Sequence, residues 1–247
     1  MALGSGATIE TGAAALLFAA TFLAGGRVHP FRPLVRDHRS VVSFGAGMSA
    51  AYVFVHLLPE LSEVRQQFVE SVEAPLRFEG MAIYFLALVG FLVFYGLDHL
   101  RAHLRESPEA ARFGLSFKLH VGGFAAYAGL VSYLLVNSLG ETPTDTGLYA
   151  VAIAFHFLSV EHALRREYGA AFERSGRFVL AGMCLLGWAV GLLFALPPYA
   201  LALLVAFLSG AIIMNSLIME LPSEKDGRFL PFVSGGVAYG LLLLPLG

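Results

Sequence analysis

The sequence is poor in charged residues and has a single cysteine, and each shortage excludes a class of protein. Only 14% of the 247 residues are charged, whereas soluble domains average about 25%. Because 57% of the residues are hydrophobic and the mean hydropathy is +0.72, a soluble globular fold is excluded. The one cysteine, Cys184, lies in an apolar stretch, so the chain forms no internal disulfide and has no CxxC metal site.

Other functional signals are also absent. The net charge is −2 and no basic stripe is interleaved with aromatic residues, so we expect no nucleic-acid partner. No nucleotide-binding signature, HExxH or GxSxG is present, and we predict neither enzymatic activity nor a bound cofactor. The first basic residue is Arg27. Since export signals begin with a basic region, we predict that the apolar run at residues 13–25 is a retained membrane span.

Eight apolar stretches approach the roughly 20 residues that a helix needs to cross a bilayer. They lie near residues 8–25, 41–62, 82–102, 115–138, 147–167, 178–197, 199–221 and 229–246. The connections are too short for a soluble domain. We therefore predict an all-α integral membrane protein with a single transmembrane domain over residues 1–247. Its helices 1–3 span about 8–102, helices 4–5 about 115–167 and helices 6–8 about 178–246.

The distribution of Lys and Arg predicts the orientation. Fourteen of the 16 basic residues follow spans 1, 3, 5 and 7, namely Arg27, Arg32, Arg36, Arg39, Arg101, Arg105, Arg112, Lys118, Arg165, Arg166, Arg174, Arg177, Lys225 and Arg228. By the positive-inside rule these connections are cytoplasmic, and both termini lie outside. We predict a multi-pass protein of a cell membrane, and the short connections favour a bacterial inner membrane.

One short segment occurs twice. Residues 44–60 align with residues 207–223, with identities at Phe44 and Phe207, Gly47 and Gly210, Leu58 and Leu221, and Pro59 and Pro222. The charge pattern orients these two helices in opposite directions. Paired short helices at corresponding positions of two halves are typical of transporters built from inverted repeats.

Polar residues at membrane depth are costly, at about 2.5–3.5 kcal/mol for an ionisable side chain, and they mark ion pathways. His56 and Glu60 are four residues apart, on one face of span 2 near the outer surface. His156 and Asn215 lie near the middle of spans 5 and 7. Others gather toward the inner half of the membrane, namely Asp98, His99, Lys118, His120, Glu161, His162 and Glu220.

Simpler interpretations remain open for several of these residues. Asp98, His99 and Glu161 lie beside arginines, so they are also explained by side chains that reach the cytoplasmic boundary. A helix end at Pro59 accounts equally well for the polar residues that flank it. Two histidines, His120 and His156, lie deep in consecutive spans. Imidazole with carboxylate is a favoured ligand set for zinc and other divalent ions, so these two predict a shared site.

Four segments resemble helices of the ZIP (Zrt/Irt-like) metal permeases. The run Phe44 to Glu60, ending His-Leu-Leu-Pro-Glu, resembles their second transmembrane helix, and residues 206–224 resemble the seventh. Residues 118–125, with Leu119-His120 and two glycines, resemble the Leu-His-Asn-x-x-Asp/Glu-Gly helix. The run His156 to Glu161 resembles the His-Glu-x-Pro-His-Glu helix. In that family the fourth and fifth helices carry the metal.

The resemblance implies a 3+2+3 arrangement of eight transmembrane helices with inverted repeats. It implies a permease that moves zinc, iron or manganese into the cytoplasm by alternating access, without ATP. The implied metal ligands are His120, His156 and Glu161, and the implied pathway residues are His56, Glu60, Asp98, His99, Asn215 and Glu220. The expected partners are the divalent ion and the lipid bilayer, and association of two copies into a homodimer is also implied by the family.

Departures from the family pattern keep other functions open. Val121 and Phe124 stand where the family has Asn and an acid, and Phe157, Ser159 and Val160 replace other conserved positions of the fifth helix. Residues five apart on a helix are turned about 140° from each other, so the first and last positions of the His156–Glu161 run cannot both face one ion. A two-metal centre is not expected. The alternatives are a ZIP-fold protein that has lost metal transport, acting as a sensor, partner subunit or carrier of another solute, and a membrane-embedded zinc hydrolase with a metal-activated water.

Overall fold

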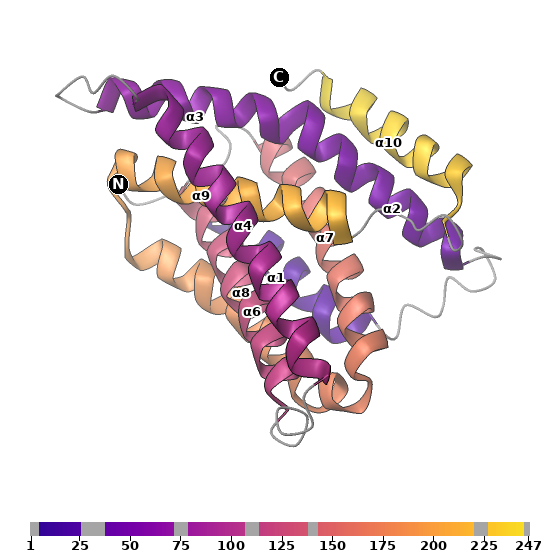
Figure 1. The fold of residues 1–247 in the computed structure, drawn as a ribbon. Coiled ribbons are helices and arrows are strands. Elements are labelled where there is room, and N and C mark those ends of the chain that lie inside the picture. The colour runs from indigo at the N-terminus through magenta and orange to yellow at the C-terminus, as the bar shows by residue number, and fades with distance from the viewer. Residues whose placement is uncertain are drawn as a thin grey trace.

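The computed structural model describes residues 5–25, 38–71, 79–106, 114–137, 143–219 and 227–244. These residues form eight continuous helical segments (Figure 1). They are α1 (Ser5–Ala24), α2 (His38–Tyr52) with η3 (Val53–Leu57) and α3 (Leu58–Ser71), α4 (Glu79–Glu106), α6 (Leu115–Asn137), α7 (Pro143–Tyr168), η4 (Phe172–Gly176) with α8 (Arg177–Leu193), α9 (Pro198–Met214) with η5 (Asn215–Met219), and α10 (Phe229–Leu243). The all-α prediction is confirmed.

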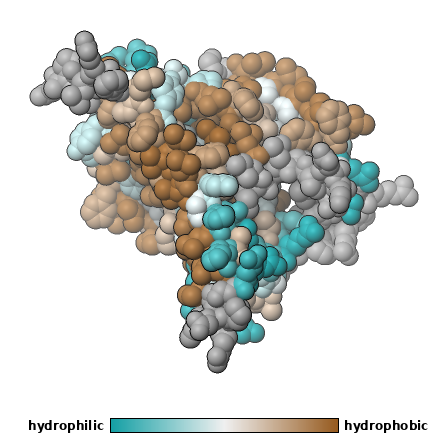
Figure 2. All heavy atoms as spheres, in the orientation of Figure 1, coloured by the Kyte–Doolittle hydropathy of each residue, from teal (hydrophilic) through white to brown (hydrophobic). Residues whose placement is uncertain are grey.

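Five of the helices are long and apolar enough to cross a membrane. They are Gly6–Ala24, Gly80–Glu106, Leu115–Asn137, Phe172–Leu193 and Pro198–Leu217. Large apolar side chains lie on the outside of the molecule, with Phe85 66% exposed, Leu193 75% and Leu230 78%. Figure 2 shows apolar atoms over most of one face, with hydrophilic side chains gathered at its lower end. Lipid solvates such a surface and water does not, as expected for a membrane-spanning protein.

The helix that contains Pro59 continues to Ser71, so the interpretation of a helix end at this proline is wrong. Proline lacks an N–H donor, and its ring collides with the carbonyl four residues earlier in a regular α-helix. The π-helical segment η3 lies immediately before it, and the Leu58 N–H donates to the carbonyl of Val53, five residues back. This wider turn lets the helix pass through the proline.

A second boundary also differs from the prediction. The sixth apolar helix was expected to span 178–197, but its helical part begins at Phe172 and ends at Leu193. Phe194 adopts an extended conformation, with φ −134° and ψ 116°. A proline disfavours the α conformation of the residue before it, and the pair Pro197 and Pro198 therefore keeps this connection out of the helix until α9 begins.

The two similar segments carry π-helical turns at matching places. At the offset of 163 residues, η3 corresponds to residues 216–220, one residue from η5 (Asn215–Met219). Both turns precede a Leu-Pro pair in the sequence. Because π-turns in α-helices are frequently found at functional sites, η3 and η5 are two candidate functional positions.

Glycines allow two pairs of helices to touch through their backbones. The helix α10 lies alongside α2 (Figure 1), and α9 packs against α4. A Cβ built on Gly47 would lie 2.0 Å from the carbonyl oxygen of Phe232, and one on Gly210 would lie 1.7 Å from that of Ala87. No side chain larger than hydrogen fits at either position without separation of the helices.

The facing helices α10 and α4 carry glycines of their own, and these lie against carbonyl oxygens of α2 and α9. A Cβ on Gly235 would lie 2.1 Å from the carbonyl oxygen of Phe44, and one on Gly90 would lie 1.9 Å from that of Phe207. Phe44 and Phe207 are themselves aligned in the sequence repeat. The crossing of α2 with α10 and the crossing of α9 with α4 therefore use residues at equivalent positions. In both, each helix supplies a carbonyl oxygen and, three residues later, a glycine.

The core of the bundle contains α6 and α9. In each of these helices 61% of the apolar stretch is buried, compared with 22% in α4. The helix α6 packs against α8 and α4, whereas α7 packs against α1 and α2. Polar side chains on α6 and α9 are therefore held at fixed positions inside the protein.

Candidate functional site

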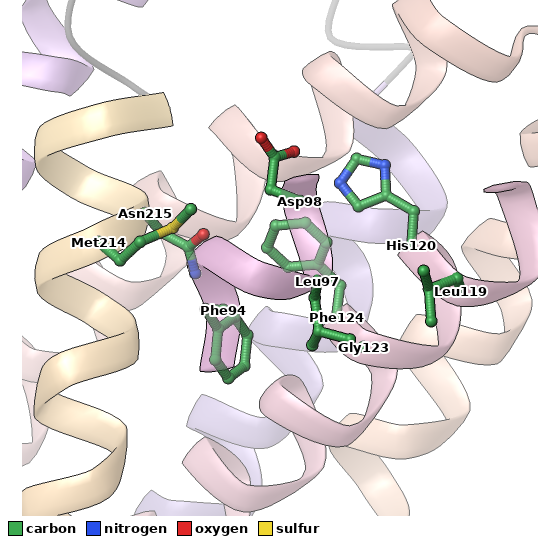
Figure 3. Close-up of a pocket in the computed structure, with 9 residues that line it drawn as sticks. All are labelled: Phe94, Leu97, Asp98, Leu119, His120, Gly123, Phe124, Met214 and Asn215. Carbon is green, nitrogen blue, oxygen red and sulfur yellow. The ribbon is translucent and has the colours of Figure 1, made fainter. Parts of the chain in front are cut away.

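A small cavity lies between α4, α6 and α9, and we call it the α4–α6–α9 cavity (Figure 3). Its lining residues are Phe94, Leu97, Asp98, Leu119, His120, Gly123, Phe124, Met214 and Asn215. Its volume of about 20 Å³ exceeds the roughly 10–15 Å³ that one water molecule requires. Three residues that the sequence analysis selected, Asp98, His120 and Asn215, thus line one space with room for a single small ion.

Asn215 contributes a buried amide to this cavity. It is the first residue of η5 and is only 3% exposed, and its Nδ2 atom has no hydrogen-bond partner among the described residues. Figure 3 shows it on the opposite side of the cavity from His120. Native proteins rarely leave a buried polar atom unsatisfied, and each case calls for an explanation such as an ion or a ligand. Because Nδ2 carries N–H donors, the partner that it lacks is an acceptor, such as the oxygen of a water molecule in the cavity.

We expect Asn215→Leu to stabilise the protein, because it removes an unsatisfied buried group from an apolar bundle. The free energy of unfolding should rise by about 1 kcal/mol, measured by thermal unfolding in detergent. The matched control is Ser216→Ala in the same turn, which should lower stability, because the Ser216 hydroxyl lies 2.9 Å from that of Ser49. Equal losses in both variants would contradict this account of Asn215.

His120 is held by the last turn of α7. Its Nδ1 atom lies 3.1 Å from the hydroxyl oxygen of Tyr168 and 3.5 Å from Oε2 of Glu167. The hydroxyl of Tyr168 also lies 3.3 Å from that of Ser116. In Figure 3 the imidazole extends toward Asp98. Because Nδ1 is directed to α7, Nε2 is the nitrogen that can act as a ligand in the cavity.

Arg101 links the cavity to α7. Its guanidinium Nη2 lies 2.6 Å from Oδ1 of Asp98, and its Nε donates to the same oxygen at 2.8 Å. A further nitrogen, Nη1, is paired with Glu167. Arg105 lies 3.5 Å from Glu167 by its own Nη1, but its side chain is largely exposed. A cation of the protein is thus already paired with the carboxylate that lines the cavity.

His156 lies in a different environment. It is buried, and its Nε2 atom is 3.1 Å from the hydroxyl oxygen of Tyr127. The Tyr127 ring packs in turn on Phe124, with centroids 6.3 Å apart, and Phe124 packs on His120. The two histidines that were predicted to share an ion are therefore hydrogen-bonded to different tyrosines, with aromatic rings packed between them.

Glu161 lies on a different side of α7 from His156, where it is held by an ion pair and by packing. Its side chain is almost fully buried and is paired with Arg165, which also pairs with Glu173 of η4. A Cβ on Gly25 would lie 2.5 Å from Oε2 of Glu161, so this carboxylate packs against the end of α1. His156 instead faces α6 through Tyr127, in agreement with the rotation of about 140° expected for residues five apart.

The remaining predicted pathway residues fall into three groups. His56 and Glu60 lie 3.9 Å apart, and Glu60 lines a second cavity of about 20 Å³, together with Tyr52, Leu57, Leu134, Tyr149, Val205, Leu208, Ser209 and Ile212. His99 is exposed and its ring stacks on Tyr95, away from the α4–α6–α9 cavity. Glu220 lies outside the described residues.

Three residues around these histidines were not identified from the sequence as part of the site. Glu167 and Tyr168 end α7 beside arginines, and this position gave no signal beyond a helix boundary. Tyr127 is seven residues after His120, which places it two turns later on the same face of α6. That spacing is the one signal from which its role could have been predicted.

The ligand set of the cavity is small. Within the part of the chain that the structure describes, no three His, Cys, Asp or Glu side chains form a group that could hold a metal ion. The α4–α6–α9 cavity combines two residues of these types with the amide of Asn215. In comparisons with known proteins, no family model matches this chain, and no curated protein sequence matches it either.

Proposed function

We propose that this protein is a membrane permease for a divalent metal cation, which binds at one site in the α4–α6–α9 cavity. The observation that carries the proposal is that Asp98, His120 and Asn215, from three different helices, line a space of about 20 Å³. Carboxylate, imidazole and amide oxygen are donors that zinc, manganese and iron accept. The proposed ligands replace His156 and Glu161 of the set expected from the sequence, because those two are engaged by Tyr127 and Arg165.

We further propose that the eight helical segments all cross the membrane in a ZIP-like 3+2+3 arrangement. Two observations support an inverted repeat. The α2–α10 and α9–α4 crossings use glycines and carbonyls in the same register, and the π-turns η3 and η5 lie at matching positions. With the predicted orientation, the cavity lies toward the cytoplasm and Glu60 toward the outside.

We propose that the two cavities lie on the path of the ion. The outer one is lined by Leu134 of α6 and the inner one by Phe124 of the same helix, a separation of ten residues or about 15 Å of helix. Residues of α9 line both cavities, and η5 contributes Asn215 to the inner one. Tyr127, which is hydrogen-bonded to His156, lies between Phe124 and Leu134 along α6. We propose that the ion passes from Glu60 to Asp98 when movement of one helix group separates Tyr127 from His156.

The proposed function is tested by equilibrium binding and uptake. Purified protein should bind one zinc, manganese, iron or cadmium ion per chain, and proteoliposomes should take up the same ion saturably. Protein-free liposomes supply the background rate. Failure to bind any of these ions at any micromolar concentration would overturn the proposal.

One observation favours a second candidate, a ZIP-like fold without metal transport. At positions where the family carries metal ligands or their neighbours, Val121 is 5% exposed, Phe157 0% and Val160 5%, so apolar packing replaces the family's ligands there. A protein that neither binds nor moves a divalent ion would support this candidate. Binding without uptake would support a sensor.

A further inference from the structure

Arg101 is the protein cation that lies against the proposed ion site. Its guanidinium makes two contacts to Oδ1 of Asp98, at 2.6 and 2.8 Å, and among the described residues that line the cavity Asp98 is the only carboxylate. The Arg101 side chain is 13% exposed, so solvent screens this pair much less than a surface pair. A divalent ion that binds to Asp98 must therefore displace a guanidinium from it.

The arrangement also provides a place for the displaced guanidinium. Arg101 is already paired with Glu167 of α7 through another nitrogen, and the same carboxylate lies 3.5 Å from His120 Nδ1. Arg101 can therefore leave Asp98 while it keeps one ion pair. The bond to Glu167 joins α4 to α7, next to the cavity and on the predicted cytoplasmic side.

On the basis of the proposed function, we infer that Arg101 is a tethered competitor of the transported cation. In the ion-free protein it neutralises Asp98, and the incoming ion takes that carboxylate while Arg101 pairs with Glu167 alone. When Arg101 returns to Asp98, it displaces the ion toward the cytoplasm. Arg101 thus lowers the affinity of the site and speeds release, and it is a positioning residue whose action requires its charge.

The test compares ion affinity and turnover in charge variants. Arg101→Gln should raise the affinity for zinc or manganese about tenfold, because a unit positive charge is removed from within a few ångströms of the ion. The maximal uptake rate should fall, because release becomes slower. Arg101→Lys keeps the charge and should remain close to wild type in both measurements.

A matched control is available on the same helix. Arg105→Gln removes the same charge one turn later. Arg105 pairs with the same Glu167 but is largely exposed, and within the described part of the chain it is not paired with Asp98, so the affinity of this variant should stay at the wild-type value. Since Arg101→Gln leaves Asp98 without its guanidinium and Glu167 with Arg105 as its remaining arginine, the double variant Arg101→Gln/Glu167→Gln serves as a second test and should still show a gain in affinity.

The outcomes separate this inference from the proposed function. If the wild-type protein binds no divalent ion, both are overturned. If it binds an ion and Arg101→Gln and the double variant leave affinity unchanged or lower it, only the role of Arg101 is rejected. Equal gains in the Arg101 and Arg105 variants would show a general electrostatic effect and would also reject it.

Discussion

His120→Ala is expected to lower the initial rate of metal uptake by about 100-fold or more. Loss of partners that only orient a metal ligand already costs 10–100-fold, and His120 supplies the imidazole of the proposed site itself. The measurement is uptake of zinc or manganese by proteoliposomes at matched protein content. His99→Ala is the matched control, because His99 lies one residue from Asp98 but is exposed and stacks on Tyr95, and its uptake should be unchanged.

His156→Ala distinguishes the two ligand sets. In the α4–α6–α9 cavity His156 is not a ligand, so its loss should reduce uptake much less than the loss of His120. An equal loss in both single variants would favour the set His120, His156 and Glu161 expected from the sequence. The double variant His120→Ala/His156→Ala should abolish uptake in either case. Uptake by His120→Ala at the unaltered rate would reject both sites.

The class of the protein and its helices follow from the sequence because they depend on local composition. Apolar stretches of about 20 residues predict spanning helices, and five long apolar helices are found. The continuation of α3 through Pro59 was not predictable in the same way. A regular helix does not accept a proline at that position, and the π-turn that accommodates it is a local adjustment with no sequence signal of its own.

The candidate site was only partly predictable, because membership of a site depends on which helices are neighbours. Asp98, His120 and Asn215 were each selected as polar residues at membrane depth, and they line one cavity. His156 was grouped with His120 because their spans are consecutive. Each histidine does face the neighbouring helix, but His120 is bonded to Tyr168 and His156 to Tyr127. The chain of ring contacts between them runs through Phe124 and Tyr127, and nothing in the sequence indicated that aromatic side chains would separate the two imidazoles.

Gly47→Ala and Gly210→Ala are expected to be strongly destabilising. In both cases the new Cβ would lie within 2.0 Å of a backbone carbonyl oxygen on the facing helix, and no rotation of a side chain can relieve that contact. Overpacking of this kind typically costs about 1–3 kcal/mol and occasionally more, and we expect the upper end of this range. Thermal unfolding in detergent measures both losses.

Gly96→Ala and Gly182→Ala are matched controls, because a Cβ at either position would meet nothing within 4 Å. Alanine also favours a helix over glycine by about 0.8–1.0 kcal/mol, so the controls should be neutral or slightly stabilising. If the two halves are inverted copies, Gly47→Ala and Gly210→Ala should cause similar losses, since each opens an equivalent crossing. A large loss at one position with none at the other would contradict the inverted repeat, and losses no greater than those of the controls would show that the helices can separate at little cost.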